Sequence, residues 1–241
     1  MDERRLRLSI VLPCYNEARN LPLLLENYRR HWEDLPAELV LVNNGSADDS
    51  AAVLETLLAT DCYGFARVVT VPKNRGYGFG LNSGLQTAEG EFVAFSHADM
   101  QCAPADVFAA YRKLIAQPEP ERTLVKGRRH GRHWRDSAVT GVMSILASVL
   151  LLKPLTDINA QPKVFHRNLL AKLAGAPDGF QFDLCVLYRA ARSESSILTV
   201  PVEFPPRIHG QSNWAFSLAS RYRTIRQMVR YMFRLSLGYD R

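Results

Sequence analysis

Short apolar runs alternate with helix-like segments along the first half of this chain, and this alternation constrains the fold most. The apolar runs cover residues 8–12, 38–42, 66–71 and 92–95. The helix-like segments, in which apolar residues recur at helical spacing, cover residues 20–32, 48–60, 80–87 and 104–115. The runs are typical of buried strands. Their alternation with helices predicts an α/β fold with a doubly wound, mainly parallel sheet and helices on both faces.

The fourth apolar run ends abruptly in a polar cluster with a single carboxylate. Asp99 stands there between His97 and Gln101. In open α/β sheets, ligands bind at the carboxyl ends of the strands. These side chains offer oxygen and imidazole ligands for a divalent ion that holds a diphosphate. A plain strand followed by a polar helix cap would give the same residues, so the cluster alone leaves both interpretations open.

Two further loops follow the first and second runs. The first reads Pro13-Cys14-Tyr15-Asn16-Glu17 and the second Asn43-Asn44-Gly45-Ser46. Tyr15 could stack on a base, and Glu17 could accept hydrogen bonds from a base or ribose. Each loop alone could be only a turn. Because parallel strands end at the same edge of the sheet, the two loops and Asp99 together predict a nucleotide pocket there.

The second half is less regular. It contains a linker at 117–121, a basic cluster at 126–135, an apolar helix at 139–152, a loop at 157–163, a helix at 182–192 and a strand at 197–203. We expect a single domain over 1–212, in two halves at 1–116 and 117–212, followed by a basic amphipathic helical tail over 213–241.

The positive net charge of the chain favours anionic partners. A formal net charge of +6 and a pI near 9.3 suit a nucleotide, a lipid phosphate or a membrane surface without choosing among them. No motif or aromatic platform favours nucleic acid. The segment 216–237 mixes arginines with apolar residues, which is typical of a helix lying in a membrane interface. A helix packed on the domain with a solvated basic face would show the same pattern.

Nothing in the sequence indicates export or a membrane span. No signal peptide is visible, and the longest apolar run, 139–152, falls short of the roughly 18–20 residues that cross a bilayer. The four scattered cysteines form no Cys-x-x-Cys pair and are typical of reduced residues. We therefore expect a cytoplasmic protein with peripheral contact at the inner face of a membrane.

Two motifs are given no functional weight. His130 and His133 have the spacing of a metal pair, but they stand within the basic cluster, where a solvated phosphate-facing loop is the commoner case. Gly76-x-Gly78-x-Gly80 resembles a dinucleotide fingerprint, but it lacks a strand directly before it and an acidic residue at the required distance after it.

In order and spacing, four segments resemble the nucleotide-sugar half of the inverting GT-A glycosyltransferases of family 2. These segments are 13–17, 42–49, 73–84 and 97–101. The second half resembles the branch that includes dolichyl-phosphate mannose synthases and other polyprenyl-phosphate glycosyltransferases. The segments similar to that branch are Lys126-Gly127-Arg128, residues 179–183 with Tyr188-Arg189-Ala190, and residues 207–212, which fit its Arg-x-x-Gly-x-Ser pattern.

The resemblance implies roles for particular residues. The nucleotide would contact Pro13, Tyr15, Glu17, Val42, Asn44, Ala98 and Asp99. A divalent cation, Mn²⁺ or Mg²⁺, would be held by Asp99 and Gln101. The donor diphosphate and the acceptor phosphate would face Arg128, Arg135, Arg207 and Ser212. The residues implied in catalysis are Asp99, Arg128, Arg207 and Asp183.

The chain departs from the family pattern at several positions. Asn43-Asn44 replaces the usual Asp-Asp, and an amide suits uracil at least as well as guanine. His97 stands where the metal motif usually begins with Asp, which weakens magnesium binding and favours manganese. Cys185 stands where many members have Glu, and Asn213 where the branch often has a basic residue.

The resemblance implies an enzyme that moves a sugar, with inversion, from a UDP- or GDP-sugar to a polyprenyl or dolichyl phosphate at the cytosolic membrane face. An ionised lipid phosphate needs no general base. A glycan hydroxyl acceptor would need one, and Asp183 is the candidate by pattern, although an N-cap or surface acid is an equal alternative. A third alternative, motivated by His97 and Asn44, is a non-catalytic protein that binds nucleotide sugars.

Overall fold

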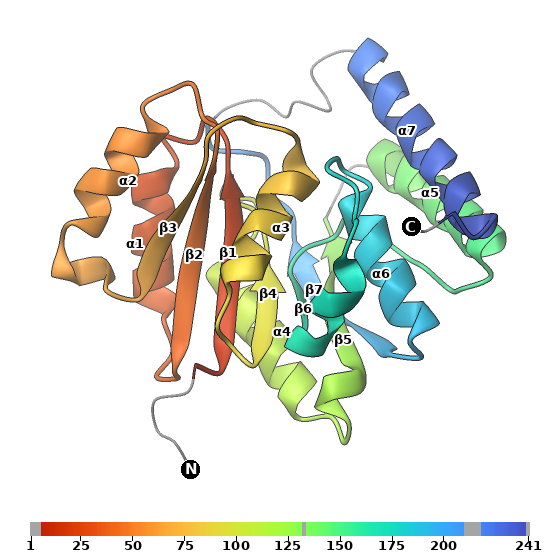
Figure 1. Cartoon of the computed structure of the whole chain (residues 1–241), viewed down its shortest axis with the longest axis horizontal. Coiled ribbons are helices and arrows are strands. Elements are labelled where there is room, and N and C mark those ends of the chain that lie inside the picture. Colours follow the sequence, from red (N-terminus) through yellow and green to blue (C-terminus); the bar gives the residue numbers. More distant parts are fainter. Residues whose placement is uncertain (1–5, 132–133, 210–217, 240–241) are drawn as a thin grey trace.

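A seven-stranded sheet in the order β3-β2-β1-β4-β6-β5-β7 forms the centre of the molecule (Figure 1). The computed structural model describes residues 6–131, 134–209 and 218–239. The strands are β1 (Leu8–Cys14), β2 (Ala37–Asn44), β3 (Ala66–Val71), β4 (Phe92–Phe95), β5 (Thr123–His130), β6 (Lys163–His166) and β7 (Ser196–Glu203). β6 runs antiparallel to β4 and β5, and the other pairs are parallel. The predicted mainly parallel α/β sheet is confirmed.

The central strands are buried on both faces because their side chains alternate between two apolar layers. Val11 and Val42 belong to one layer, and Ile10 and Leu41 to the other. The first layer is covered by α3 (Tyr77–Thr87) and α6 (Phe182–Arg192), and the second by α1 (Leu21–His31), α2 (Ser50–Leu58) and α4 (Pro104–Ile115). Helices therefore cover both faces, as predicted.

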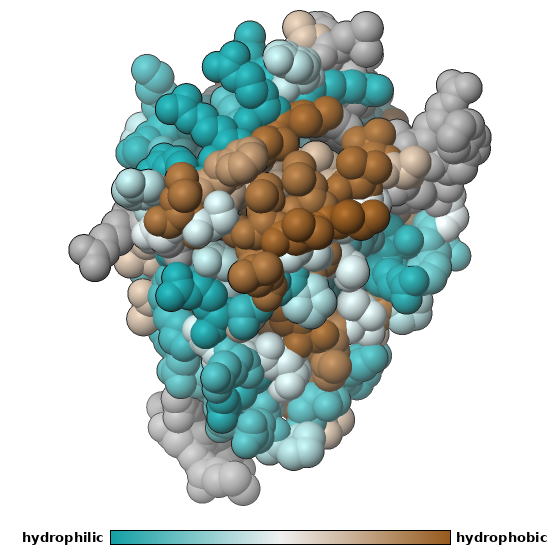
Figure 2. Space-filling model, turned by 90° about the vertical axis from the view of Figure 1, so that its right-hand side faces the viewer, coloured by the Kyte–Doolittle hydropathy of each residue, from teal (hydrophilic) through white to brown (hydrophobic). Residues whose placement is uncertain are grey.

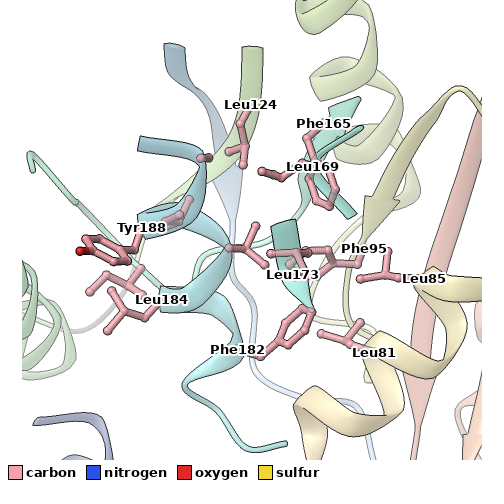
Figure 3. Close-up of a cluster of buried hydrophobic side chains, with 14 of the residues drawn as sticks. Leu81, Leu85, Phe95, Leu124, Phe165, Leu169, Leu173, Phe182, Leu184 and Tyr188 are labelled. Atoms are coloured by element: carbon pink, nitrogen blue, oxygen red, sulfur yellow. The ribbon is translucent and has the colours of Figure 1, made fainter. Parts of the chain in front are cut away.

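The layer beneath α3 and α6 anchors the element that carries Asp183. Phe182, at the start of α6, packs edge-on against Phe95 of β4 with 5.9 Å between the ring centroids (Figure 3). Phe165 of β6 meets the other side of this cluster, again edge-on to Phe95. Because Phe182 is fully buried, the first turn of α6 is held at the sheet.

The helices α5 (Trp134–Leu151) and α7 (Leu218–Ser236) pack against each other at one side of the molecule (Figure 1). Met228, Met232 and Leu235 of α7 are buried in the same layer as α6. The amphipathic helix thus packs on the domain through one face. Within the ranges described above, no helix is both long and apolar enough to cross a membrane.

Two strands, β5 and β6, were not predicted. β5 overlaps the expected basic cluster at 126–135, which was not assigned a strand. The expected loop at 157–163 leads directly into β6, which lies between β4 and β5 and is antiparallel to both. With only four residues, beginning at Lys163, β6 shows too little apolar pattern to be recognised from sequence. Short 3₁₀ turns complete the described secondary structure at η1 (Asp61–Tyr63), η2 (Pro120–Arg122) and η3 (Arg167–Leu173).

Candidate active site

A cavity of about 700 Å³ lies at the carboxyl ends of β1, β2 and β4 and extends to α5 and α7. The parallel register of these three strands explains why loops far apart in sequence reach this one place. Nine side chains implied by sequence line it: Pro13, Tyr15, Glu17, Asn44, Ala98, Asp99, Gln101, Asp183 and Arg207. The structure brings these residues together, and their roles remain predictions.

Four other implied residues are not placed in the cavity. Val42 is fully buried and packs against α3 at Gly84. Arg128 is exposed and does not line the cavity. Arg135 falls within α5, but its side chain is outside the described part of the structure, and Ser212 lies outside the described residues altogether.

Arg129, which sequence reasoning missed, lines the cavity in place of Arg128. Successive side chains of a strand point to opposite faces, so a shift of one residue along β5 exchanges the two arginines. The Arg129 backbone N–H donates to Asp157 Oδ2 at 2.8 Å, and its Nε donates to Oδ1 at 2.9 Å. Although burial alone would raise it, these contacts lower the pKa of Asp157. Arg129 is thus a fixed cation in the cavity wall.

The first loop, at 13–17, is attached to the second by hydrogen bonds. The backbone N–H groups of Asn16 and Glu17 donate to Ser46 Oγ at 3.1 Å and Ser50 Oγ at 3.0 Å. The Ala47 N–H donates in return to Asn16 Oδ1 at 2.8 Å. These contacts fix Glu17 at the cavity, where burial raises the pKa of its carboxyl.

Asn44 presents an unpaired acceptor at the same end. Its Nδ2 donates to the Gly76 carbonyl at 3.0 Å, whereas its buried Oδ1 has no hydrogen-bond partner among the described residues. A Cβ at Gly80 would lie 2.6 Å from the Asn44 amide, so only glycine admits α3 this close. Gly76 and Gly78 of the same motif instead lie against the backbone at residues 177–179. An unsatisfied buried acceptor costs about 1–3 kcal/mol, which an N–H donor from a ligand would recover.

Asp99 and Gln101 are joined by Arg207. Asp99 is 3% exposed and its Oδ2 lies 2.7 Å from the Arg207 guanidinium. Its Oδ1 accepts the Gln101 backbone N–H at 3.1 Å. Arg207 Nε also donates to Gln101 Oε1 at 3.3 Å. The carboxylate, the amide oxygen and the guanidinium thus form one charged cluster. It lies at the end of the cavity lined by the loops after β1, β2 and β4, which we call the donor end because the sequence predicts the sugar donor there.

The side chains that could ligate a metal here suit a divalent cation whose other ligands come from a bound diphosphate. Among the described residues, no group of three or more His, Cys, Asp or Glu side chains could hold a metal alone. Asp99 supplies a carboxylate and Gln101 an amide oxygen, and Mg²⁺-type ions commonly combine one or two carboxylates with substrate phosphates. Burial lowers the pKa of His97, so its ring is neutral at pH 7 and could serve as a nitrogen ligand. The residues present fit a metal–diphosphate complex.

Asp183 lies in the cavity floor within a buried polar network. It is 1% exposed and forms an ion pair with Lys163, which is fully buried. Its Oδ1 also accepts Gln161 Nε2 at 2.8 Å, and its Oδ2 accepts Asn159 Nδ2 at 3.4 Å. Gln161 Nε2 also donates to the Tyr77 hydroxyl at 3.1 Å. Sequence reasoning missed Lys163 and Gln161 because both fell in an expected loop.

The other end of the cavity is apolar and is formed by α5 and α7. Its apolar lining comprises Val139, Met143, Ile225 and Met228. The same two helices also contribute polar lining residues: Thr140, Ser144, Arg221 and Thr224. Val139 and Ile225 are also 47% and 36% exposed, so the cavity reaches the molecular surface between these helices.

An exposed apolar band lies over the same two helices (Figure 2). We define the α5–α7 surface as Val142, Ile145, Val149, Leu152, Tyr222 and Phe233. The three residues within α5 recur at helical spacing and are each about two-thirds exposed. The arginines of α7 are also exposed: Arg221, Arg223, Arg226, Arg230 and Arg234. An apolar band edged by cations is typical of an interaction site.

Comparisons with known sequences point to a single enzyme class. The sequence model described as Glycosyl transferase family 2 matches residues 9–170. An uncharacterized glycosyltransferase of Mycobacterium tuberculosis (strain ATCC 25618 / H37Rv) is 32% identical over 216 residues, covering 88% of this chain and 91% of that protein. The undecaprenyl-phosphate 4-deoxy-4-formamido-L-arabinose transferase of Proteus mirabilis (strain HI4320) is 25% identical over 216 residues. That match covers 87% of this chain but only 63% of the transferase.

A solved structure shares the fold. It is glucosyl-3-phosphoglycerate synthase from Mycobacterium tuberculosis, in complex with Mn²⁺, uridine diphosphate and glucosyl-3-phosphoglycerate. It matches with a TM-score of 0.72 and 20% identity, over 96% of this chain and 80% of that one. The likeness confirms the expected GT-A fold.

Proposed function

This chain belongs to glycosyl transferase family 2, and we propose that it moves a hexose, with inversion, from a nucleotide diphosphate sugar to a polyprenyl phosphate at a membrane surface. The observation that carries the proposal is the continuity of the cavity. One end is polar and holds Asp99 and Arg207. The other is lined by Val139, Met143, Ile225 and Met228, which belong to the two helices that carry the exposed α5–α7 surface. A lipid phosphate has the same two parts, an anionic head and an apolar chain.

The donor end supports a nucleotide diphosphate. Tyr15 and Glu17 line this end, which fits their proposed contacts with a base and ribose, and the unpaired Oδ1 of Asn44 could accept the N3–H of uracil. The N1–H of guanine would also meet this acceptor. The structural neighbour that binds uridine diphosphate with Mn²⁺ makes a UDP-sugar the first donor to test.

The charges in the cavity suit a direct displacement at the anomeric carbon. The leaving diphosphate gains negative charge, and preorganised cations stabilise such charge most effectively. Arg207 forms an ion pair with Asp99, and a divalent ion held by Asp99 and Gln101 would add its own charge there. Arg129 and Arg221 also line the cavity, and we infer that they meet an acceptor phosphate.

The buried network argues against a hydroxyl acceptor. Asp183 would have to accept a proton to serve as the general base, and doing so would remove its ion pair with the fully buried Lys163. A phosphate nucleophile is already ionised and makes no such demand. We assign Asp183 to the shape and polarity of the cavity floor rather than to proton transfer.

The α5–α7 surface supports membrane contact. Val142, Ile145 and Val149 form an exposed apolar stripe on α5, and α7 carries five arginines and no acidic residue. An exposed apolar stripe on α5, next to the exposed arginines of α7, suits an interface containing anionic lipid. The cavity reaches the surface between the same helices, so an acceptor phosphate could enter from the bilayer. We also propose that the membrane contact is at the cytosolic face.

The test is transfer of a labelled sugar into an organic phase. The enzyme is incubated with Mn²⁺, a radiolabelled UDP- or GDP-sugar and vesicles containing undecaprenyl phosphate, then extracted with butanol. We expect label in butanol that depends on the lipid phosphate and is lost in Asp99→Asn. Label found only in water-soluble glycan would support the hydroxyl acceptor, and no turnover with any donor would favour the non-catalytic alternative.

A further inference from the structure

Arg207 forms an ion pair with Asp99, the carboxylate implied to hold a divalent cation. Its guanidinium lies 2.7 Å from Asp99 Oδ2, while Oδ1 is engaged by a backbone N–H. It also contacts the amide oxygen of Gln101, the other implied metal ligand. A divalent ion that coordinates Asp99 Oδ2 must therefore displace the guanidinium or share the carboxylate with it at a large electrostatic cost.

The segment that carries Arg207 is held to the donor end by further contacts. Gln101 Nε2 donates to the Pro205 carbonyl at 2.8 Å. Asn20 Nδ2 donates to the His209 carbonyl at 3.4 Å. The side chain of Arg207 is 26% exposed, so the guanidinium lies at the cavity rather than in the core. It has room to change partners.

We propose that Arg207 makes metal binding depend on the nucleotide diphosphate. The guanidinium competes with a free divalent cation for Asp99. When a diphosphate enters, its oxygens offer the guanidinium a bidentate partner and offer the metal its missing ligands. Arg207 then moves from Asp99 to the diphosphate, and the metal takes its place. Arg207 is in this respect a positioning residue, and the proposal rests on the donor class assigned above.

This exchange is a coupling between two ligands, so it must be reciprocal. The nucleotide raises the affinity for metal by the same factor by which the metal raises the affinity for nucleotide. Removing the Arg207 guanidinium should therefore reduce both the gain in metal affinity caused by nucleotide and the gain in nucleotide affinity caused by metal. The metal alone should bind better because its competitor is gone, whereas the metal with nucleotide should lose a phosphate contact.

The test measures binding of Mn²⁺ by electron paramagnetic resonance, first alone and then with saturating UDP and, in parallel, GDP. In wild type we expect weak binding alone and a large gain with nucleotide. In Arg207→Gln we expect Mn²⁺ alone to bind about fivefold tighter and the gain to shrink by at least the same factor. Asp99→Asn should abolish the Mn²⁺ signal assigned to this site in both backgrounds.

Arg112→Gln is the matched control, because it removes a guanidinium from an ion pair with Glu33 that lies outside the cavity. It should bind Mn²⁺ as wild type does. Unchanged or weaker binding of Mn²⁺ alone to a folded Arg207→Gln would overturn the proposal. The measurement without nucleotide is independent of the donor. If neither UDP nor GDP binds, the donor assignment fails while the competition at Asp99 is still decided.

Discussion

The two ends of the cavity are built in different ways. The donor end consists of loops that follow parallel strands, and its polar side chains hold one another, as Arg207 holds Asp99 and Gln101. The apolar end consists of two helices that bury one side and leave Val142 and Ile145 about two-thirds exposed. The polar side chains of the donor end are already held in place to bind an ionic ligand. The second end has exposed apolar surface, and this difference is the basis on which we propose a small charged donor and a lipid acceptor.

The largest effect is expected from breaking the donor end. Asp99→Asn keeps the shape of the side chain but removes the charge that holds Arg207 or a metal. We expect transfer to fall about 10²–10³-fold, the range typical for loss of one electrostatic contact to a developing charge. Binding to vesicles should be unchanged, because the α5–α7 surface is intact. A variant that keeps wild-type transfer would remove Asp99 from the mechanism.

The cavity floor between the two ends can be tested through stability. Lys163→Met leaves Asp183 buried without its cation and should lower the free energy of unfolding by about 3–5 kcal/mol, measured with urea. Adding Asp183→Leu removes the uncompensated charge and should restore much of the loss. If Lys163→Met is as stable as wild type, the Lys163–Asp183 ion pair does not stabilise the cavity floor.

The apolar end is tested by adding charge to its exposed face. Ile145→Glu with Val149→Glu should reduce vesicle co-sedimentation, and transfer to vesicle-borne acceptor, about tenfold or more, because two carboxylates oppose insertion and repel anionic lipid. UDP binding should stay unchanged. The control is Leu23→Glu on α1, which is 44% exposed and far along the chain from the α5–α7 surface. Equal losses in the control and the test variant would contradict a specific docking face.

The last prediction concerns Lys126, which is buried on β5 beside Lys163 of β6. Burial first, and the nearby Lys163 second, lower the pKa of Lys126 to about 7. The unfolded chain then binds more protons between that value and the ordinary lysine pKa, so this group makes stability rise with pH above 7, by at most about 1.4 kcal/mol per pH unit.

Lys126→Met should therefore show a smaller rise in unfolding free energy between pH 7 and pH 9, measured by urea denaturation at each pH. An identical rise in the variant and wild type would show that Lys126 does not titrate in this window.

The donor end was largely predictable from sequence, and the apolar end was not. Pro13, Asn44 and Asp99 each follow an apolar run, and the parallel sheet obliges such positions to meet. Arg128 and Arg129 show the limit of this reasoning, because neighbouring residues on a strand differ only in the face to which they point.

The helices of the second half carried a more ambiguous pattern. Burial in the core is the commoner fate of an apolar segment such as 139–152, but the pattern also fits an exposed helix, and only tertiary packing decides which side is covered. The segment proved to be partly both, since Ala147 is buried while Ile145 is 67% exposed. The Lys163–Asp183 pair could not be foreseen, because β6 was not recognised as a strand.

The central claim is that one cavity joins a nucleotide sugar at its polar end to a lipid phosphate at its apolar end. A polyprenyl phosphate with a photoreactive diazirine in its isoprenoid chain tests it directly. Irradiation in vesicles, followed by mass spectrometry, should place cross-links on Val139 and Met143 of α5 and on Ile225 and Met228 of α7. Excess undecaprenyl phosphate should suppress them. Cross-links confined to other surfaces, or unaffected by the competitor, would contradict the account.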